Sequence, residues 1–271
     1  MIHHDRERLR ETFNLDAELY DRARPGYPME LFSDLADLAD VGSGCRVLEI
    51  GCGTGQLTVP LAKHGCEIVA VDIGSDMAAV ASCHLRNYPS VQVIVAPFED
   101  WPLPARPFDV VVSATAFHWL DPAVRVIKSA EALRPDGVLA TVATHHIAGG
   151  DEDFFVRVQR CYEQWKPSAS TRIHLQAAAE IPMDSEEISR SGRFGPATFQ
   201  RYEWEKTYSA TAYCELLLTY SDHRALASEA RQGLLDCVAN LIESQYSGQI
   251  TKRYLTELRL ARRSGIDKNY R

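Results

Sequence analysis

Short runs of apolar residues alternate with longer amphipathic stretches between residues 46 and 143. The short runs are rich in valine and isoleucine, which is typical of strands buried on both faces of a parallel sheet. Five strands are predicted, at 46–50, 67–71, 91–95, 108–113 and 138–143. Helical spacing predicts the intervening helices, at 56–63, 76–85 and 122–133. Because crossovers between parallel strands are right-handed, this alternation predicts an α/β fold with a doubly wound, Rossmann-like sheet.

The two ends of the chain have a different pattern. Residues 6–22 and 29–38 are predicted to be helical, on either side of a proline- and glycine-containing break. Residues 145–150 are expected to form a loop. Further helices are predicted at 153–166, 211–226 and 231–244, and strands at 199–208 and 250–260, the last of which also fits a helix. The predicted organisation is an N-terminal helical part (1–40), a sheet core (41–146) and a C-terminal part (147–271).

The composition fits a folded globular protein and argues against nucleic acid and anionic membranes as its general partners. Of the 271 residues, 45% are hydrophobic and 24% are charged, and the formal net charge is -8. An acidic chain is a poor general binder of nucleic acid or of anionic membranes. Residues 252–271 are locally basic, and a solvated strand and terminus is the simplest interpretation of them.

The cysteines and the N-terminus indicate a cytoplasmic protein. The seven cysteines are odd in number and contain no Cys-x-x-Cys pair, which argues against a disulfide framework and a cysteine zinc site. We therefore expect a reducing compartment and no metal. The polar N-terminus does not resemble a signal peptide, and no apolar stretch reaches the ~20 residues that a membrane helix needs.

Three alternate glycines follow the first predicted strand. Residues 49–55 read Glu-Ile-Gly-Cys-Gly-Thr-Gly. Gly51, Gly53 and Gly55 therefore lie at the carboxyl end of a strand, where open α/β sheets bind ligands. Glycine allows the backbone to turn tightly and to approach a ligand closely. The alternative is that these residues only make a tight turn.

Two carboxylates strengthen the ligand hypothesis. Asp72 ends the second strand, where a carboxylate can accept hydrogen bonds from ribose hydroxyls. Glu49 lies within an apolar strand, and burying a carboxylate is costly unless it is paired. A cationic ligand or the glycine-loop amides could pair it. A capped turn for Asp72 and an exposed strand edge for Glu49 are the alternatives.

The glycine spacing argues against a dinucleotide. The dinucleotide fingerprint is Gly-x-Gly-x-x-Gly, and its third glycine would fall at Gln56. The chain has Gly55 instead. This spacing fits a ligand that contains adenosine but no phosphates.

The glycine loop followed by Asp72 resembles the class I S-adenosylmethionine-dependent methyltransferases. The resemblance extends over about residues 13–146 and includes a branch of small-molecule enzymes similar to trans-aconitate methyltransferase. The segments that carry it are Tyr-Asp-Arg-Ala-Arg-Pro-Gly-Tyr-Pro at 20–28, Phe-Asp-Val-Val-Val-Ser-Ala at 108–114, Ala-Phe-His-Trp-Leu-Asp-Pro at 116–122 and Leu-Arg-Pro-Asp-Gly at 133–137. The resemblance implies a seven-stranded, mostly parallel sheet with an N-terminal helical lid and a C-terminal helical cap.

The resemblance also implies roles for individual residues. The three glycines would approach the methionine part of S-adenosylmethionine, and Asp72 would bind its ribose. The remaining residues that we predict to line the cofactor are Tyr20, Arg24, Tyr27, Glu49, Ile73, Met77, Phe98, Glu99, Ala114 and Phe117. The family often has an acid at the position of Pro97, so the adenine amino contact would here fall to backbone groups or Glu99.

The predicted reaction is methyl transfer from S-adenosylmethionine to a small molecule, leaving S-adenosylhomocysteine. In-line displacement depends mainly on holding the two reactants in alignment. An oxygen acceptor is favoured, and nitrogen or carbon stays open. His118 would be a general base or would orient the substrate, because histidine titrates in the right range; alternatively it bonds the cofactor or its own loop.

Three other functions share some of these features. An NAD(P)-dependent oxidoreductase has the fold but conflicts with Gln56, and an RNA methyltransferase conflicts with the acidic charge. A non-catalytic binding module is disfavoured by the intact glycines and Asp72. The sequence leaves the acceptor and the oligomeric state open.

Overall fold

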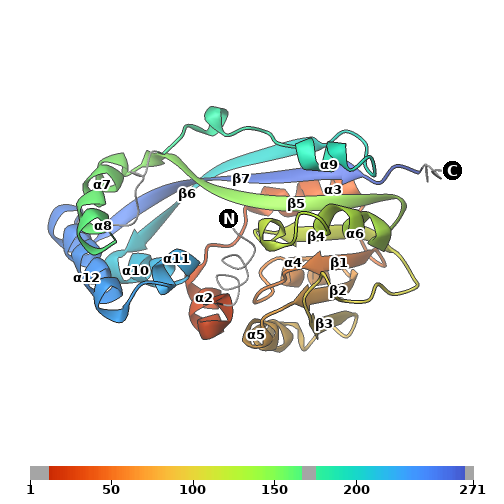
Figure 1. Ribbon diagram of the computed structural model, residues 1–271, viewed down its shortest axis with the longest axis horizontal. Helices are drawn as coiled ribbons and strands as arrows, with labels where there is room; N and C mark the ends of the chain where they lie inside the picture. Colours follow the sequence, from red (N-terminus) through yellow and green to blue (C-terminus); the bar gives the residue numbers. More distant parts are fainter. Residues whose placement is uncertain (1–11, 167–174, 266–271) are drawn as a thin grey trace. The chain divides into compact units, whose positions relative to one another are not determined.

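The predicted strands form one seven-stranded sheet in the order β3-β2-β1-β4-β5-β7-β6 (Figure 1). The structure is a computed structural model that describes residues 12–166 and 175–265. The strands are β1 (Arg46–Ile50), β2 (Glu67–Asp72), β3 (Val91–Val95), β4 (Phe108–Ala114), β5 (Leu133–Gly150), β6 (Thr198–Ser209) and β7 (Gln249–Arg262).

Helices connect the strands and extend the chain at both ends. In the first half they are α2 (Ala17–Ala23), α3 (Met29–Ala39), α4 (Thr58–Lys63), α5 (Ser75–Leu85) and α6 (Arg125–Ala132). In the second half they are α7 (Glu152–Arg157), α8 (Gln159–Trp165), α9 (Glu186–Arg190), α10 (Ala210–Leu218), α11 (Ser221–Arg224) and α12 (Ser228–Gln245). Short 3-10 helices are η1 (Thr12–Asp16), η2 (Phe117–Trp119) and η3 (Ala178–Glu180).

The first five strands are parallel, and all of them except the edge strand β3 are largely buried. Val47 of β1 pairs with Ile68 of β2 and with Val110 of β4. Alternate residues of each strand face opposite sides, so β1 contributes Val47 to one core and Leu48 to the other. Helices α3, α4 and α5 complete the first core, and α6 and α9 complete the second. The fold is therefore the predicted doubly wound, Rossmann-like α/β sheet.

Strand β7 runs against the direction of β5, and β6 runs against β7 and so in the same direction as β5. The Arg263 amide donates to the Gly137 carbonyl, and the Thr144 hydroxyl contacts the Thr256 hydroxyl, so residue numbers rise on β5 as they fall on β7. β6 and β7 are likewise antiparallel: the Gly195 amide donates to the Arg262 carbonyl, and Thr207 contacts Thr251. The mixed sheet agrees with the expected mostly parallel arrangement.

The chain forms two compact units. Unit 1 contains residues 1–25, 145–182 and 203–255, and unit 2 contains residues 26–144, 183–202 and 256–271. The three long strands β5, β6 and β7 contribute residues to both. The glycine loop and Asp72 belong to unit 2. The division into lid, core and cap stays a prediction.

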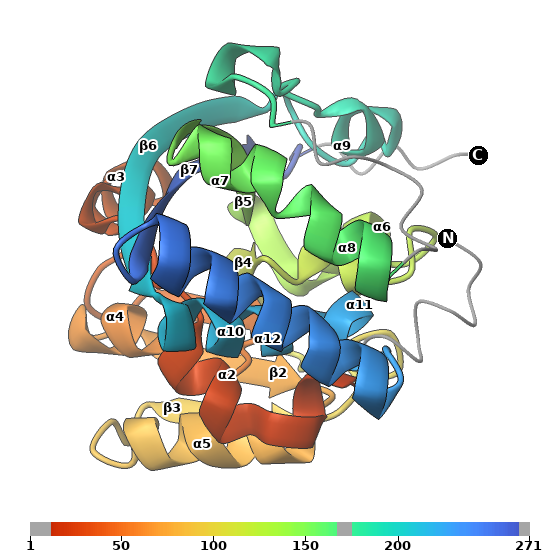
Figure 2. The same ribbon diagram turned by 90° about the vertical axis from the view of Figure 1, so that its left-hand side faces the viewer.

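Unit 1 has its own aromatic core. Helix α12 packs against α8 and α10 (Figure 2). Phe154, Tyr213 and Tyr254 are among its buried side chains. A disulfide joins Cys161 of α8 to Cys237 of α12, across a sequence separation of 76 residues. The cysteine count did not predict this bond, because an isolated pair leaves no spacing pattern; the other five cysteines are free.

Several predicted boundaries were wrong. Residues 145–150 do not form a loop, because β5 continues to Gly150. The helices predicted at 153–166 and 211–226 are each divided into two shorter helices. Asp121 does not start a helix at Pro122: its carboxylate accepts a hydrogen bond from the Ala123 amide in a turn, and α6 begins at Arg125. The part of the first predicted helix at 6–11 lies outside the described residues.

Candidate functional site

The glycine loop makes a turn that other residues could not make without strain. Gly51, Gly53 and Gly55 have φ values of 72°, 56° and 91°, in the left-handed region that favours glycine. A Cβ at Gly51 would lie 2.4 Å from the Ala116 Cβ, in the loop after β4. The loops that follow β1 and β4 therefore meet closely at the carboxyl edge of the sheet.

Asp72 fixes this turn with both of its carboxylate oxygens. Oδ2 accepts a hydrogen bond from the Gly53 amide at 2.8 Å, and Oδ1 accepts one from the Gly74 amide at 2.8 Å. The Gly51 amide also donates to the Val71 carbonyl at 2.7 Å. A carboxylate oxygen has two lone pairs, so this arrangement is compatible with further donors such as ribose hydroxyls. The predicted role of Asp72 in cofactor binding stays a prediction.

Glu49 is a carboxyl group buried inside the sheet, not at an exposed strand edge. Its residue is 1% exposed, and its Oε2 has no hydrogen-bond partner. Burial raises the pKa of Glu49 to about 8; the Thr58 hydroxyl opposes this shift and the Asp72 carboxylate adds to it. The Thr54 hydroxyl is also buried without a partner, and the Thr58 hydroxyl, although it is close to Glu49, makes no hydrogen bond of standard geometry. These three polar groups lie in the glycine loop or the elements that flank it, so a polar or cationic ligand here would relieve a cost of folding.

An apolar side chain is exposed where β2 ends. Ile73 is 38% exposed, although the four residues Ile68–Val71 are buried. This exposed surface is suited to covering by a flat apolar ligand, as predicted for adenine. Met77, by contrast, lies in the first turn of α5 and is buried. The Phe98 ring packs in the core, and the Lys128 ammonium lies over it. A ligand could therefore contact the backbone of Phe98 but not its ring.

Glu99 has structural contacts beside its predicted cofactor role. Its Oε1 accepts a hydrogen bond from the Asp121 amide at 3.2 Å, and its carbonyl accepts one from Lys128 Nζ at 2.8 Å. These contacts join the turn after β3 to the turn before α6 and to α6 itself. Glu99 therefore supports this edge of the sheet whether or not it touches a ligand.

The loop after β4 contains a strained residue that the sequence analysis missed. Thr115 has φ of 52°, which is unfavourable for a β-branched side chain. Its amide donates to the Val142 carbonyl at 2.8 Å, and its hydroxyl lies 3.2 Å from the Tyr27 hydroxyl. The structure thus brings Tyr27 to the β4 loop. No sequence signal marks a positive φ at a threonine.

The other predicted residues of this loop differ in exposure. Ala114 and Phe117 are buried, whereas His118 is exposed on η2 beside the Trp119 ring. His118 is therefore accessible in unit 2. Tyr20 and Arg24 lie in unit 1, where the Arg24 guanidinium is 5.1 Å from the centre of the Tyr20 ring. Their predicted roles stay predictions.

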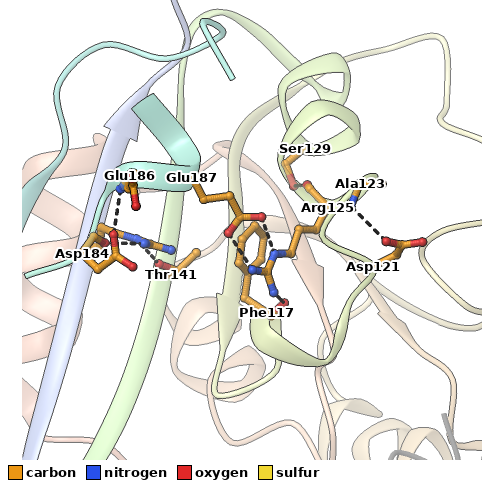
Figure 3. Close-up of polar contacts among 10 residues, drawn as sticks. Phe117, Asp121, Ala123, Arg125, Ser129, Thr141, Asp184, Glu186 and Glu187 are labelled. Atoms are coloured by element: carbon orange, nitrogen blue, oxygen red, sulfur yellow. Dashed lines mark hydrogen bonds and ion pairs between the residues drawn. The ribbon is translucent and has the colours of Figure 1, made fainter. Parts of the chain in front are cut away.

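An ion pair fixes the backbone of η2 (Figure 3). Arg125 of α6 donates from Nε and Nη2 to the two carboxylate oxygens of Glu187, at 2.7 and 2.6 Å. Its Nη1 donates to the Phe117 carbonyl at 3.0 Å, one residue before His118. Arg259 lies on the same face, where it donates to the Thr141 hydroxyl at 3.0 Å and to the Asp184 carbonyl at 2.6 Å. Together these contacts attach α9 to the loop that carries His118.

Two kinds of feature were not found in the described part of the chain. No cluster of three or more histidine, cysteine or acidic residues there could hold a metal ion. No helix there combines the length and apolar character that crossing a bilayer requires.

The buried Glu49 carboxyl predicts a pH-dependent stability. Its native pKa of about 8 is above its ordinary value of 4.5, so the native state keeps a proton that the unfolded state releases between these values. The wild-type protein should therefore lose stability, relative to Glu49→Gln, as the pH rises from about 5 to about 8, by up to ~1.4 kcal/mol per pH unit. Denaturant unfolding of both proteins across this range measures the difference. Parallel stability profiles would contradict the assignment.

The Arg125–Glu187 pair should couple more strongly than an exposed pair on the same helix. Its side chains are 16% and 31% exposed, whereas those of the Arg190–Glu186 pair are 76% and 66% exposed. A double-mutant cycle with Arg125→Met and Glu187→Gln should give a coupling of roughly 1–2 kcal/mol. The control cycle at Arg190 and Glu186 should give ~0.3–0.5 kcal/mol. Equal couplings would show that the first pair does not fix the loop.

Comparison with known proteins identifies the domain that contains this site. Residues 48–141 match a family model described as a methyltransferase domain. An uncharacterised methyltransferase of Mycobacterium tuberculosis is 37% identical over 131 residues, which is 48% of this chain and 51% of that protein. A probable S-adenosylmethionine-dependent methyltransferase of Saccharomyces cerevisiae is 29% identical over 131 residues, 47% of this chain and 45% of that protein. The chain thus spans about half the length of the curated relatives it matches.

The fold is also found among solved structures. A putative type II methyltransferase from Anaeromyxobacter dehalogenans superposes with a TM-score of 0.54 and 23% sequence identity, covering 88% of this chain and 97% of that chain. At this identity the similarity shows the fold alone. Residues 48–141, which contain the glycine loop and Asp72, therefore match a methyltransferase domain model, and they lie within a fold that solved methyltransferase structures share.

Proposed function

We propose that the chain transfers a methyl group from S-adenosylmethionine to a small-molecule acceptor, with oxygen the favoured acceptor atom. One observation carries the proposal: within the matched domain, the Asp72-braced glycine loop lies against the strained loop after β4. Binding and reacting groups are commonly held on such loops at the carboxyl edge of a parallel sheet.

The residues at this edge fit the cofactor. S-adenosylmethionine, when bound, supplies a methyl group on a cationic sulfonium. In our proposal the three glycines admit its methionine part, Asp72 accepts hydrogen bonds from its ribose, and Ile73 packs on its adenine. The unpartnered Oε2 of Glu49 and the exposed Ile73 side chain support this fit, because each gains a partner when a cationic adenosine ligand is present.

The acceptor would be aligned by the loop after β4 and by residues outside the matched domain. His118 is exposed there, and Arg125 holds the preceding carbonyl, so its backbone position is fixed. We propose that His118 removes a proton from a hydroxyl acceptor or orients it. The N-terminal lid with Tyr20, Arg24 and Tyr27, the trans-aconitate methyltransferase-like branch and the cytoplasmic location belong to the same proposal.

Two other functions are less well supported. An oxidoreductase using NAD(P) would require a different glycine spacing, and the matching relatives named above are described as methyltransferases. An RNA methyltransferase would have to bind a polyanion with a chain of net charge -8. A small-molecule acceptor agrees better with this charge.

Replacing Asp72 should weaken cofactor binding. In Asp72→Asn, one carboxylate oxygen is replaced by an NH₂ group that faces a backbone N–H, and the remaining oxygen has no charge. The site therefore loses a charged acceptor, and a hydrogen bond to a charged group contributes ~1.5–3 kcal/mol. The affinity for S-adenosylhomocysteine, measured by calorimetry, should fall roughly tenfold to hundredfold. Asp76→Asn, an exposed acid in α5, is the matched control and should change it less than about twofold. Equal affinities in the two variants would show that Asp72 does not contribute to cofactor binding.

Methyl transfer should depend on His118 only for acceptors that must lose a proton. Radiolabelled S-adenosylmethionine is incubated with panels of carboxylic acids, phenols, alcohols and amines, and labelled products are separated by chromatography. His118→Ala should reduce turnover of a hydroxyl acceptor by about 10²–10⁴-fold, because a general base contributes about that factor. His84→Ala, in α5, is the control for a histidine elsewhere in unit 2. Full turnover by His118→Ala would show that His118 has no role in proton transfer.

A further inference from the structure

Unit 1 contains a buried lysine that forms no ion pair with any acidic residue in the described part of the chain. Lys252 lies on β7 and is 3% exposed. Among the described residues its ammonium forms no ion pair, and its polar contact is the Tyr220 hydroxyl at 3.4 Å. The rings of Tyr254, Tyr220 and Tyr213 surround it, with centres 5.1, 5.7 and 5.9 Å from Nζ. A buried ammonium is costly, and three aromatic faces offset only part of that cost.

A second cation lies against the same tyrosine. The Arg24 guanidinium is 4.6 Å from the centre of the Tyr220 ring. Its Nη2 donates to the Thr219 carbonyl at 3.0 Å, but its Nε is buried without a hydrogen-bond partner. The two positive charges therefore share the Tyr220 ring, and in the described residues neither has a carboxylate beside it.

A third donor group completes the cluster. His146 on β5 has a buried Nε2 without a hydrogen-bond partner. Its ring packs edge-on against Phe155 at 4.4 Å and lies 6.2 Å from the Tyr254 ring. Burial lowers the pKa of His146 to about 3, and the Lys252 charge adds to this effect, so the imidazole is neutral. A neutral imidazole can still donate one N–H.

We propose that Lys252, Arg24 and His146 form a binding site for the carboxylate of a small organic acid, inside a cage of tyrosine side chains in unit 1. The three groups supply an ammonium, an unused guanidinium N–H and an imidazole nitrogen, and an anion would partner all three. Lys252 is buried and Arg24 is half-buried with a buried Nε, and no carboxylate among the described residues accounts for these two cations beside one ring.

The surrounding side chains favour a carboxylate on an apolar body. The hydroxyls of Tyr208 and Tyr254 are hydrogen-bonded at 2.8 Å, and the Tyr254 ring stacks on the Trp204 ring with their centres 4.6 Å apart. These aromatic faces suit a hydrocarbon or aromatic chain. A phosphate dianion is hydrophilic on all sides and would have to exchange its water for such rings. We therefore assign the site to a monocarboxylate rather than to a phosphate.

This inference does not depend on the proposed function. Residues 48–141, which match the methyltransferase model, all lie in unit 2, whereas Lys252, Arg24 and His146 lie in unit 1. The binding site can be tested without any turnover.

Calorimetry on the full chain tests the site with hexanoate and 3-phenylpropionate, and with their uncharged amides. The wild-type protein should bind at least one of the acids at least tenfold more tightly than its amide, since a charged hydrogen bond gives about that factor or more. Lys252→Met, which keeps the length and removes the charge, should lose this preference. Lys206→Met is the matched control, because Lys206 also lies over a tyrosine ring, 5.1 Å from Tyr208, and should keep the affinity within about twofold.

Thermal unfolding without ligand gives a second readout that a purely structural lysine would not share. Lys252→Met should raise the midpoint by about 2 °C or more, because it removes an unpaired buried charge. A lysine retained only for its aromatic contacts would give a lower midpoint instead. A lower midpoint, binding of neither acid below about 10 mM, or tighter binding of inorganic phosphate than of both acids would each overturn the proposal.

Titration with S-adenosylhomocysteine in the same samples separates this inference from the proposed function. A protein that binds S-adenosylhomocysteine but neither acid would refute the carboxylate site alone. A protein that binds an acid through Lys252 but does not bind S-adenosylhomocysteine would refute the methyltransferase proposal and leave the site standing.

Discussion

The two hydrogen bonds of the Asp72 carboxylate are the constraint on which the candidate site depends. They connect the end of β2 to the Gly53 amide in the loop after β1 and to the Gly74 amide before α5. With that loop fixed, Gly51 lies against Ala116, and the loop after β4 has to turn away through the strained Thr115 backbone. Three chain segments that are far apart in sequence thus have defined positions at one edge of the sheet. Pre-organisation of this kind is what an alignment-dependent reaction such as methyl transfer requires.

The sequence predicts this edge well because its signals are local. Apolar runs of β-branched residues predicted all five parallel strands, since the central strands contribute side chains to a core on each face of the sheet. Gly51, Gly53 and Gly55 could be identified because their positive φ values leave little choice of residue. Glu49 was conspicuous as an acidic residue between the apolar residues Leu48 and Ile50.

Other features depend on partners that are distant in sequence. The extension of β5 to Gly150 is determined by pairing with β7, not by the histidine- and glycine-containing segment itself. The Cys161–Cys237 bond and the Arg125–Glu187 pair join residues separated by 76 and 62 positions. Lys252 looked like part of a solvated basic tail, because only the folded structure shows the three tyrosine rings around it. Burial by remote elements is the property that single-sequence patterns do not contain.

Each unit contains a buried ionisable group that its neighbours leave only partly satisfied. In unit 2 it is the Glu49 carboxyl, which favours a cationic ligand, and in unit 1 it is the Lys252 ammonium, which favours an anionic one. Such groups reduce the stability of the folded protein, and ligands of opposite charge would recover it. S-adenosylmethionine and an organic acid have the corresponding charges.

Ligand-dependent thermal unfolding tests the central claim most directly. S-adenosylhomocysteine, S-adenosylmethionine, NAD and NADP are compared in parallel on the full chain. A ligand at ~100 times its Kd adds ~2.7 kcal/mol of stability, which at ~2–4 °C per kcal/mol raises the midpoint by several degrees. The account predicts this rise with S-adenosylhomocysteine and S-adenosylmethionine and no shift with NAD or NADP. A rise with NAD or NADP and none with S-adenosylhomocysteine would contradict it.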